Sequence, residues 1–162
     1  MITEDSLRTG SCLCKQVSYS FPADAVVSAH HCHCEDCRKS TGSGKATIVL
    51  ILDQALKISG EIKYFSVVGS GGNKVSSGFC PACGSPLISS VEGYEGTKFI
   101  KAGSLDDSSW VTINSSFWSD TAMDWSPLDK SLDKSRERWK LFEPPMFRNS
   151  ALFSLSLVEN CI

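Results

Sequence analysis

Short stretches of alternating or continuously apolar residues recur along the chain, separated by turns rich in glycine, asparagine and serine. A period of two between apolar and polar positions is typical of a β-strand, and a short continuous apolar run indicates a strand buried on both faces. The run at 46–52, ATIVLIL, is the clearest of the second kind. The other segments that predict strands are 16–21, 61–68, 74–79, 86–91, 97–105 and 111–118. The pattern therefore predicts an all-β fold with little helix.

The region beyond residue 128 allows two interpretations. Leu128, Leu132 and Trp139 are spaced for one face of a helix over 128–142, and a solvated charged segment is the alternative. No linker or internal repeat divides the chain, so we expect one domain over residues 8–140. Residues 141–162 form a C-terminal tail, and the sequence pattern at its end is compatible with either a strand or a frayed terminus.

Composition narrows the function classes. The chain has 162 residues, of which 41% are hydrophobic and 21% charged, and this is typical of a single globular domain with a core. The formal net charge of −2 disfavours nucleic acid or an anionic membrane as a partner. No apolar run is long enough to span a bilayer, and the first ten residues do not resemble a signal peptide. We therefore expect a cytoplasmic protein that acts on a small molecule.

The eight cysteines are the strongest functional signal. In a reducing compartment, so many thiols indicate metal binding or thiol chemistry rather than disulfides. Most of them fall into tight groups with one or two residues between neighbours, which suits two ligands to one ion better than a disulfide. The groups are CLC (Cys12, Cys14), CHCEDC (Cys32, Cys34, Cys37) and CPAC (Cys80, Cys83), with Cys161 alone.

The first and third groups predict a closed structural zinc site. CPACG is a zinc knuckle, in which proline fixes the turn and glycine leaves backbone N–H groups free to contact thiolate sulfur. A knuckle supplies two of the four ligands of a structural zinc. If Cys12 and Cys14 lie on a strand, their side chains point the same way and supply the other two. The alternative is that Cys12, Cys14, Cys80 and Cys83 are buried free thiols.

The second group predicts a different kind of site. Cys32, Cys34 and Cys37 provide three ligands, and three protein ligands with an open fourth position are the arrangement of a catalytic zinc. His33 stands between two cysteines and is expected to point the opposite way. Two alternatives remain, namely that a neighbouring histidine closes the site or that the three thiols bind no metal.

Charged and aromatic residues near these cysteines are candidates for substrate binding. Arg38 and Lys39 follow Cys37 directly and are able to hold a carboxylate or balance the thiolates, with a solvated loop as the alternative. Trp118, Asp120 and Trp125 are candidates for lining a pocket, although aromatic residues at this spacing are more often part of a core.

Five segments together carry a family resemblance: GSCLCKQVSYSF, HCHCEDCRKSTGS, SSGFCPACGSPL, IKAGSLDD and FWSDTAMDW. In order and spacing, over roughly residues 10–125, they resemble the glutathione-dependent formaldehyde-activating enzyme family, also called the GFA or CENP-V domain family. The resemblance implies an Mss4-like β-tent of antiparallel sheets held by a structural zinc with four cysteine ligands. It also implies a second zinc on the Cys-x-Cys-x-x-Cys loop, carbon–sulfur lyase activity and glutathione as co-substrate.

The chain departs from the family pattern at two motifs. Lys15 follows Cys14 where glycine is usual, and Ser116-Phe117-Trp118 stands where many members have His-Ile-Trp. If that histidine assists the family's chemistry, this chain lacks it.

Three functional hypotheses follow. The first is a zinc-dependent carbon–sulfur lyase that acts on glutathione or thiol adducts of the S-hydroxymethylglutathione type. The second is a biosynthetic or detoxification enzyme of the same scaffold that acts on a larger electrophile or thioether. The third is a non-catalytic zinc module that binds a protein or nucleic acid.

Overall fold

The computed structural model describes residues 7–135, and these residues form mainly β-strands. The strands are β1 (Leu7–Ser11), β2 (Ser18–Pro22), β3 (Val26–Cys32), β4 (Ala46–Leu52), β5 (Lys57–Ser59), β6 (Lys63–Val68), β7 (Lys74–Phe79), β8 (Pro86–Val91), β9 (Thr97–Lys101), β10 (Ser115–Phe117) and β11 (Asp133–Ser135). The one α-helix in this part of the chain is α1 (Glu35–Thr41), and single turns of 3-10 helix occur at Ala23–Ala25, Asp53–Ala55, Ala102–Ser104 and Ser119–Thr121. The predicted mainly-β fold is confirmed.

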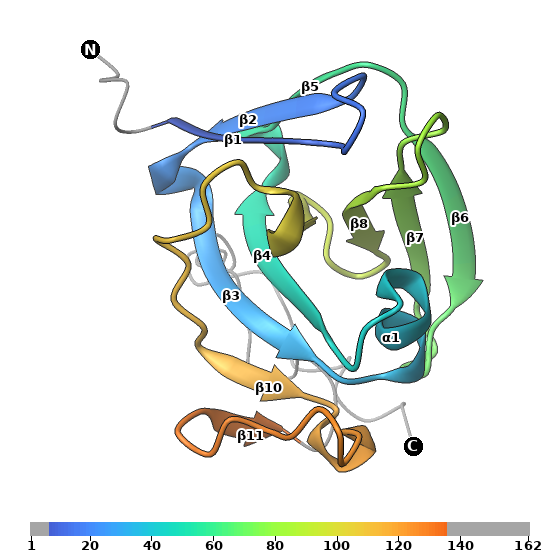
Figure 1. Cartoon of the computed structure of the whole chain (residues 1–162), viewed down its shortest axis with the longest axis vertical. Helices are drawn as coiled ribbons and strands as arrows, with labels where there is room; N and C mark the ends of the chain where they lie inside the picture. Colours follow the sequence, from blue (N-terminus) through green and yellow to red (C-terminus); the bar gives the residue numbers. More distant parts are fainter. Residues whose placement is uncertain (1–6, 136–162) are drawn as a thin grey trace, which may run out of the picture.

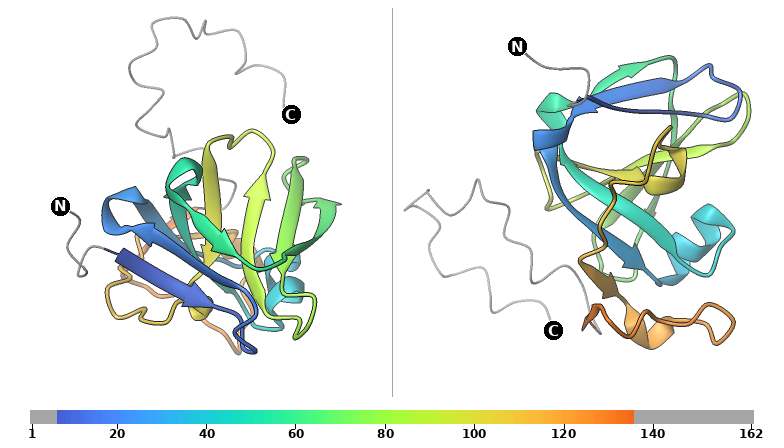
Figure 2. Two further views of the ribbon diagram at one scale, coloured as in Figure 1. Left: turned by 90° about the horizontal axis from the view of Figure 1, so that it is seen from above. Right: turned by 60° about the vertical axis from the view of Figure 1, so that its left-hand side comes forward.

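The strands form two sheets (Figure 1). A three-stranded sheet has the order β1-β2-β5, and an eight-stranded sheet has the order β11-β10-β3-β4-β9-β8-β7-β6. Neighbouring strands are antiparallel except at β10, which runs parallel to both β3 and β11. The three-stranded sheet lies at one end of the eight-stranded sheet, and β10 and β11 lie at the other (Figure 2).

Strand β4 is buried on both faces, which explains its continuous apolar sequence. Val49 and Ile51 point to the core cluster that also contains Phe21 from the three-stranded sheet. Ile48 and Leu50 point to a second cluster, on the opposite face. Because successive side chains of a strand alternate between faces, one strand contributes to two separate apolar layers.

Several predicted strands agree closely with the structure, and others were missed or were too long. The segments 46–52, 74–79 and 86–91 coincide with β4, β7 and β8. The strand predicted over 97–105 ends at Lys101, where a 3-10 turn begins, and only three residues of 111–118 are extended. The helix over 128–142 is wrong for its described part, since residues 133–135 form β11 and the rest lies outside the described residues, as does the tail 141–162.

Helix α1 was not predicted, because it is too short to show a helical period and none of its residues is buried. Its ends are nevertheless well formed. The Sγ atom of Cys34 accepts a hydrogen bond from the backbone N–H of Cys37 at 3.4 Å, and Gly42 closes the helix with a φ of 64°. Lys39 and Glu35 form an i,i+4 ion pair at 2.6 Å. Within residues 7–135, no helix has the length and apolar character needed to cross a membrane.

Gly10 offers a test of how the small sheet packs. A Cβ atom at Gly10 would overlap the Tyr19 ring and lie 2.6 Å from the carbonyl oxygen of Ser104, whereas a Cβ atom at the exposed Gly103 would meet nothing within 4 Å. We expect Gly10→Ala to lower the free energy of unfolding by about 2 kcal/mol through overpacking. Gly103→Ala, the control, should change it by less than about 0.5 kcal/mol. Urea unfolding measures both values, and equal stabilities would contradict this packing.

Candidate metal centres and adjoining cavity

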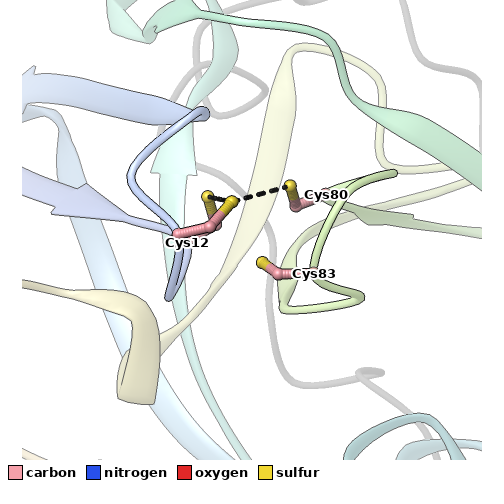
Figure 3. Close-up of side chains that lie close together, drawn as sticks. Cys12, Cys80 and Cys83 are labelled. Atoms are coloured by element: carbon pink, nitrogen blue, oxygen red, sulfur yellow. Dashed lines mark hydrogen bonds between the residues drawn. The ribbon is translucent and has the colours of Figure 1, made fainter.

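Four cysteines from two distant loops converge on one point. Cys12 and Cys14 follow β1, and Cys80 and Cys83 follow β7; their sulfur atoms all lie within 4.8 Å of one another. The Sγ atoms of Cys12 and Cys14 are 3.5 Å apart, and those of Cys14 and Cys80 are 3.7 Å apart. Figure 3 shows Cys12 facing Cys80 and Cys83 across the gap between the loops. The structure thus brings together the four residues predicted for the closed site.

Each loop turns tightly enough to present both of its thiols. In the first loop, the N–H of Lys15 donates to the carbonyl of Cys12 at 3.0 Å, and Lys15 has a φ of 65°. In the second, the N–H of Gly84 donates to the carbonyl of Cys80 at 2.9 Å, and Gly84 has a φ of 73°. The expectation that Cys12 and Cys14 lie on a strand is wrong, because β1 ends at Ser11 and a turn directs both sulfurs to one side.

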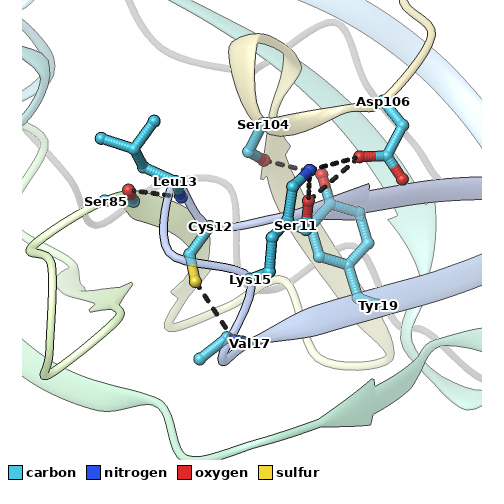
Figure 4. A network of polar contacts seen from close by, with 9 residues as sticks. All are labelled: Ser11, Cys12, Leu13, Lys15, Val17, Tyr19, Ser85, Ser104 and Asp106. Atoms are coloured by element: carbon cyan, nitrogen blue, oxygen red, sulfur yellow. Dashed lines mark hydrogen bonds and ion pairs between the residues drawn. The ribbon is translucent and has the colours of Figure 1, made fainter.

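A polar network holds the first loop in position (Figure 4). The N–H of Leu13 donates to Oγ of Ser85 in the second loop at 3.0 Å, which ties the two loops together. Nζ of Lys15 donates to Oγ of Ser11 at 2.8 Å and lies 3.6 Å from Oδ1 of Asp106. The side chain of Lys15 therefore links the first loop to Ser11 and Asp106.

The second cluster lies where β3 passes into α1. Cys32 ends β3, Cys34 caps the helix, and Cys37 lies in its first turn. Their sulfur atoms are also within 4.8 Å of one another, and the Sγ atoms of Cys32 and Cys34 are 3.5 Å apart. Cys32 and Cys34 are buried. No histidine belongs to this cluster among the residues that the structure describes.

The protonation of the second cluster favours a bound cation. Hydrogen bonds from Cys32 and Cys37 lower the pKa of the Cys34 thiol to about 3. The hydrogen bonds with Cys34 and Cys37, together with burial, raise the pKa of Cys32 well above its ordinary value. Without a metal, one thiolate therefore forms and opposes ionisation of its neighbours. A divalent cation would let all three ionise.

Both clusters fit zinc. A tetrahedral ion with Zn–S bonds of about 2.3 Å needs sulfur atoms roughly 3.8 Å apart, close to the separations observed. Thiolate sulfur is a preferred donor for this ion. The first cluster supplies four donors and the second supplies three, as the sequence predicted.

The three histidines before and within the second cluster have other environments. His30 bonds to Ser115 and Ser28 at 2.9 and 2.7 Å, and Nδ1 of His31 lies 3.0 Å from Oγ1 of Thr47. Burial lowers the pKa of His30 and of His31 to about 4, so both are neutral near pH 7. The His33 ring is fully buried, and neither of its nitrogen atoms has a hydrogen-bond partner among the described residues.

A cavity of about 380 Å³ adjoins the second cluster, and all three of its cysteines line the wall. Alternate residues of β9, β8, β7 and β6 form the remaining wall, together with residues of α1 and the β6–β7 turn. Aliphatic and aromatic groups form most of the wall surface, and polar side chains are contributed by α1, the β6–β7 turn and single positions on the strands. A volume of this size is within the range of small-molecule sites.

Two buried residues of this wall were not identified from the sequence. Lys101, at the end of β9, is 7% exposed and lines the cavity, and none of the ion pairs within residues 7–135 involves it. Hydrogen bonding with Cys32 lowers the pKa of Cys37, and the charge of Lys101 lowers it too. The hydrogen bond with Cys34 and burial together have the larger effect, and they raise the pKa of Cys37 to about 12. Ser89, on β8, is 5% exposed, and its Oγ has no hydrogen-bond partner within the described part of the chain.

The residues predicted to bind substrate divide into two groups. Lys39 and Trp118 line the cavity. Arg38, Asp120 and Trp125 do not line it, and Trp125 is 70% exposed beside Gly44. The only signal in the sequence for Lys101 and Ser89 was that each is a polar residue at an inward position of an apolar strand.

Two of the comparisons with known proteins give a match, one by sequence and one by structure. The sequence profile of the family described as "Glutathione-dependent formaldehyde-activating enzyme" matches residues 7–121. No curated protein matches the chain. Among solved structures, a Rhodobacter sphaeroides protein from a structural genomics programme is similar at 18% identity, over 60% of this chain and 87% of that chain, with a TM-score of 0.48. Because the profile covers most of the chain and all seven clustered cysteines, the chain belongs to the family of glutathione-dependent formaldehyde-activating enzymes.

Proposed function

We propose that the protein is a zinc-dependent carbon–sulfur lyase that forms and splits adducts between the thiol of glutathione and an aldehyde carbon. Cys12, Cys14, Cys80 and Cys83 would hold a structural zinc, and Cys32, Cys34 and Cys37 a catalytic one. The observation that carries the proposal is the three-thiol cluster in the wall of a cavity, since three ligands leave one position for a substrate.

The reaction is an addition and its reverse. In the forward direction the thiol sulfur forms a bond to the aldehyde carbon, the carbonyl π bond breaks, and the thiol proton ends on the oxygen. When bound, the second zinc would supply an open coordination position that favours a thiolate or polarises an oxygen. The residues of the chain must supply proximity, charge balance and exclusion of water.

Lys101 is suited to the charge balance. Three thiolates and a dication carry a formal charge of −1, and the Lys101 cation lies close enough to Cys37 to favour its thiolate. The same cation could stabilise the oxygen that becomes negative as the carbon–sulfur bond forms. Lys39, which lines the cavity and has a side chain that is 77% exposed, is suited to a carboxylate of glutathione, and Trp118 to covering the bound adduct. Because glutathione is abundant in the reducing cytosol, the proposal includes a cytoplasmic location.

Exchange NMR of an equilibrium mixture of glutathione and aldehydes tests this function. Zinc-loaded protein should accelerate exchange between the free aldehyde and its glutathione adduct, and Cys34→Ser should abolish the acceleration. The aldehydes should include formaldehyde and longer homologues. Absence of acceleration with every aldehyde would contradict the proposal.

The two zinc sites should differ in their effect on folding. A structural zinc contributes apparent binding energy on the order of 10 kcal/mol, which is also folding energy. We expect Cys80→Ser to give insoluble or molten protein, and Cys34→Ser to stay folded with about half of the zinc. Thermal unfolding and elemental analysis measure this, and equal melting temperatures would show that the division into structural and catalytic sites is wrong.

The second site should keep one exchangeable position. X-ray absorption measures the ligands of this zinc, once the four-sulfur signal that Cys34→Ser retains is subtracted from that of the zinc-loaded protein. The difference should show three sulfur atoms and one light atom, and it should change when a thiol is added. His33→Ala should leave the zinc content unchanged, because His33 is not among the clustered ligands. An imidazole at this zinc that persists when thiol is added would instead indicate a second closed site.

Lys101 can be tested against a lysine on the same strand. Lys101→Met keeps the length of the side chain and removes its charge, and we expect kcat/KM to fall about 10- to 100-fold with the zinc content unchanged. Lys98 is the control, since it pairs with Asp53 at 3.3 Å and does not line the cavity. Lys98→Met should stay within about twofold of the original enzyme. Equal losses in both variants would remove Lys101 from the proposed chemistry.

A further inference from the structure

The cavity wall has a regular composition that follows from the register of four strands. Phe99 of β9 is opposite Ser89 of β8, Ser89 is opposite Ser77 of β7, and Ser77 is opposite Phe65 of β6. All four residues line the cavity. Two phenyl rings therefore flank a pair of hydroxyl groups along one cross-strand row.

A second row lies two residues further along the same face. Val91 of β8 is opposite Val75 of β7, and Val75 is opposite Val67 of β6. These three valines also line the cavity. A one-carbon group bound near the cysteines would leave most of this apolar surface in contact with water, which is unfavourable.

The ring of Tyr94 and the β6–β7 turn complete the wall, and the turn is tied to the cysteine cluster. Oδ2 of Asp36, in α1, accepts hydrogen bonds from the N–H of Ser70 at 3.3 Å and from its hydroxyl at 3.5 Å. Asp36 and Ser70 both line the cavity, as does Tyr94. The apolar rows and the three thiols are thus parts of one enclosure.

Two of the buried residues that line the cavity, Lys101 and Ser89, carry a polar side chain. The Ser89 hydroxyl is buried, lines the cavity and has no hydrogen-bond partner among residues 7–135. A buried hydroxyl without a partner is costly, so a group that bonds to it gains free energy on binding. An apolar cavity with a small number of placed polar groups is the usual composition of a site for an organic ligand.

We propose that the aldehyde-derived part of the substrate is an apolar skeleton of several carbon atoms, which carries an oxygen that hydrogen-bonds to Ser89. This inference rests on the proposed function for the carbon–sulfur bond itself. The skeleton lies against the rows of Phe99, Phe65 and the three valines, and the sulfur meets the open position at Cys32, Cys34 and Cys37. The peptide part of glutathione extends from the cavity past Lys39 toward solvent.

Stable S-alkylglutathiones test the apolar wall by binding alone. Calorimetry on zinc-loaded protein should give a Kd that falls about fourfold for each added methylene from S-methyl through S-butyl to S-hexylglutathione. Two thiols that lack the peptide extend the test. 2-Phenylethanethiol, which has the larger apolar group, should have a lower Kd than 2-mercaptoethanol. A Kd that does not change with apolar size in either series would overturn the proposal.

A matched pair of variants locates the effect in this cavity. Phe65 is 67% exposed at the edge of the cavity, and Tyr64 is 49% exposed and does not line it. Phe65→Ser should reduce the preference for hexyl over methyl at least threefold. Tyr64→Ser should leave it unchanged. Equal effects of the two substitutions would overturn the assignment of the wall.

Ser89 requires its own comparison. S-phenacylglutathione has a ketone that S-(2-phenylethyl)glutathione lacks. The original protein should bind the ketone about tenfold more tightly, and Ser89→Ala should remove this preference. Ser90→Ala, one residue along β8 and not part of the cavity wall, should retain it. Equal Kd values for the two ligands in the original protein would overturn the role of Ser89.

Failure of this inference and failure of the proposed function give different results. Tighter binding with apolar size, but no accelerated adduct exchange for any aldehyde, would retain the skeleton site and overturn the lyase. Accelerated exchange with formaldehyde, but no dependence of Kd on apolar size, would retain the lyase and overturn the skeleton site.

Discussion

Burial of β4 on both faces is the constraint on which the rest of the structure depends. One face of this strand must be covered by the three-stranded sheet, and the other lies beneath the residues that surround the cysteine cluster. The layers that cover the two faces of the sheet need contacts that hold them in place. On the first face, two cysteine loops converge on one point. On the second face, a hydrogen bond joins α1 to the β6–β7 turn.

The division of roles between the two faces also explains why the cysteine clusters differ. Both loops of the first cluster turn back on themselves, so four sulfurs surround one point. In the second cluster a single chain segment passes from a strand into a helix and supplies only three. All three of these cysteines line the cavity, and no second cysteine loop approaches them among the described residues.

The sequence allowed the two cysteine clusters and the central strands to be predicted, because both depend on local patterns. Thiol spacing identified the two clusters. The apolar run ATIVLIL gave the bounds of β4, and the glycine-rich turn and the CPAC motif that flank β7 and β8 gave theirs. Strands β1, β3 and β5 were missed because their sequences show no clear alternation of apolar and polar residues, and β5 is only three residues long. Lys101 and Ser89 were missed for a different reason, since their inward orientation follows from the register of neighbouring strands. Arg38, Asp120 and Trp125 were chosen for proximity along the chain, which does not establish proximity to the cavity.

The hydrogen bond from Ser70 to Asp36 joins the turn over the cavity to the helix that carries Cys37. The position of the β6–β7 turn and the position of α1 therefore depend on each other. If a ligand that contacts the turn changes the affinity of the cysteine cluster for an ion, thermodynamic reciprocity requires that the ion change the affinity for that ligand by the same factor. The two hydrogen bonds from Ser70 to the Asp36 carboxylate are the contacts through which such coupling between ligand and ion would pass.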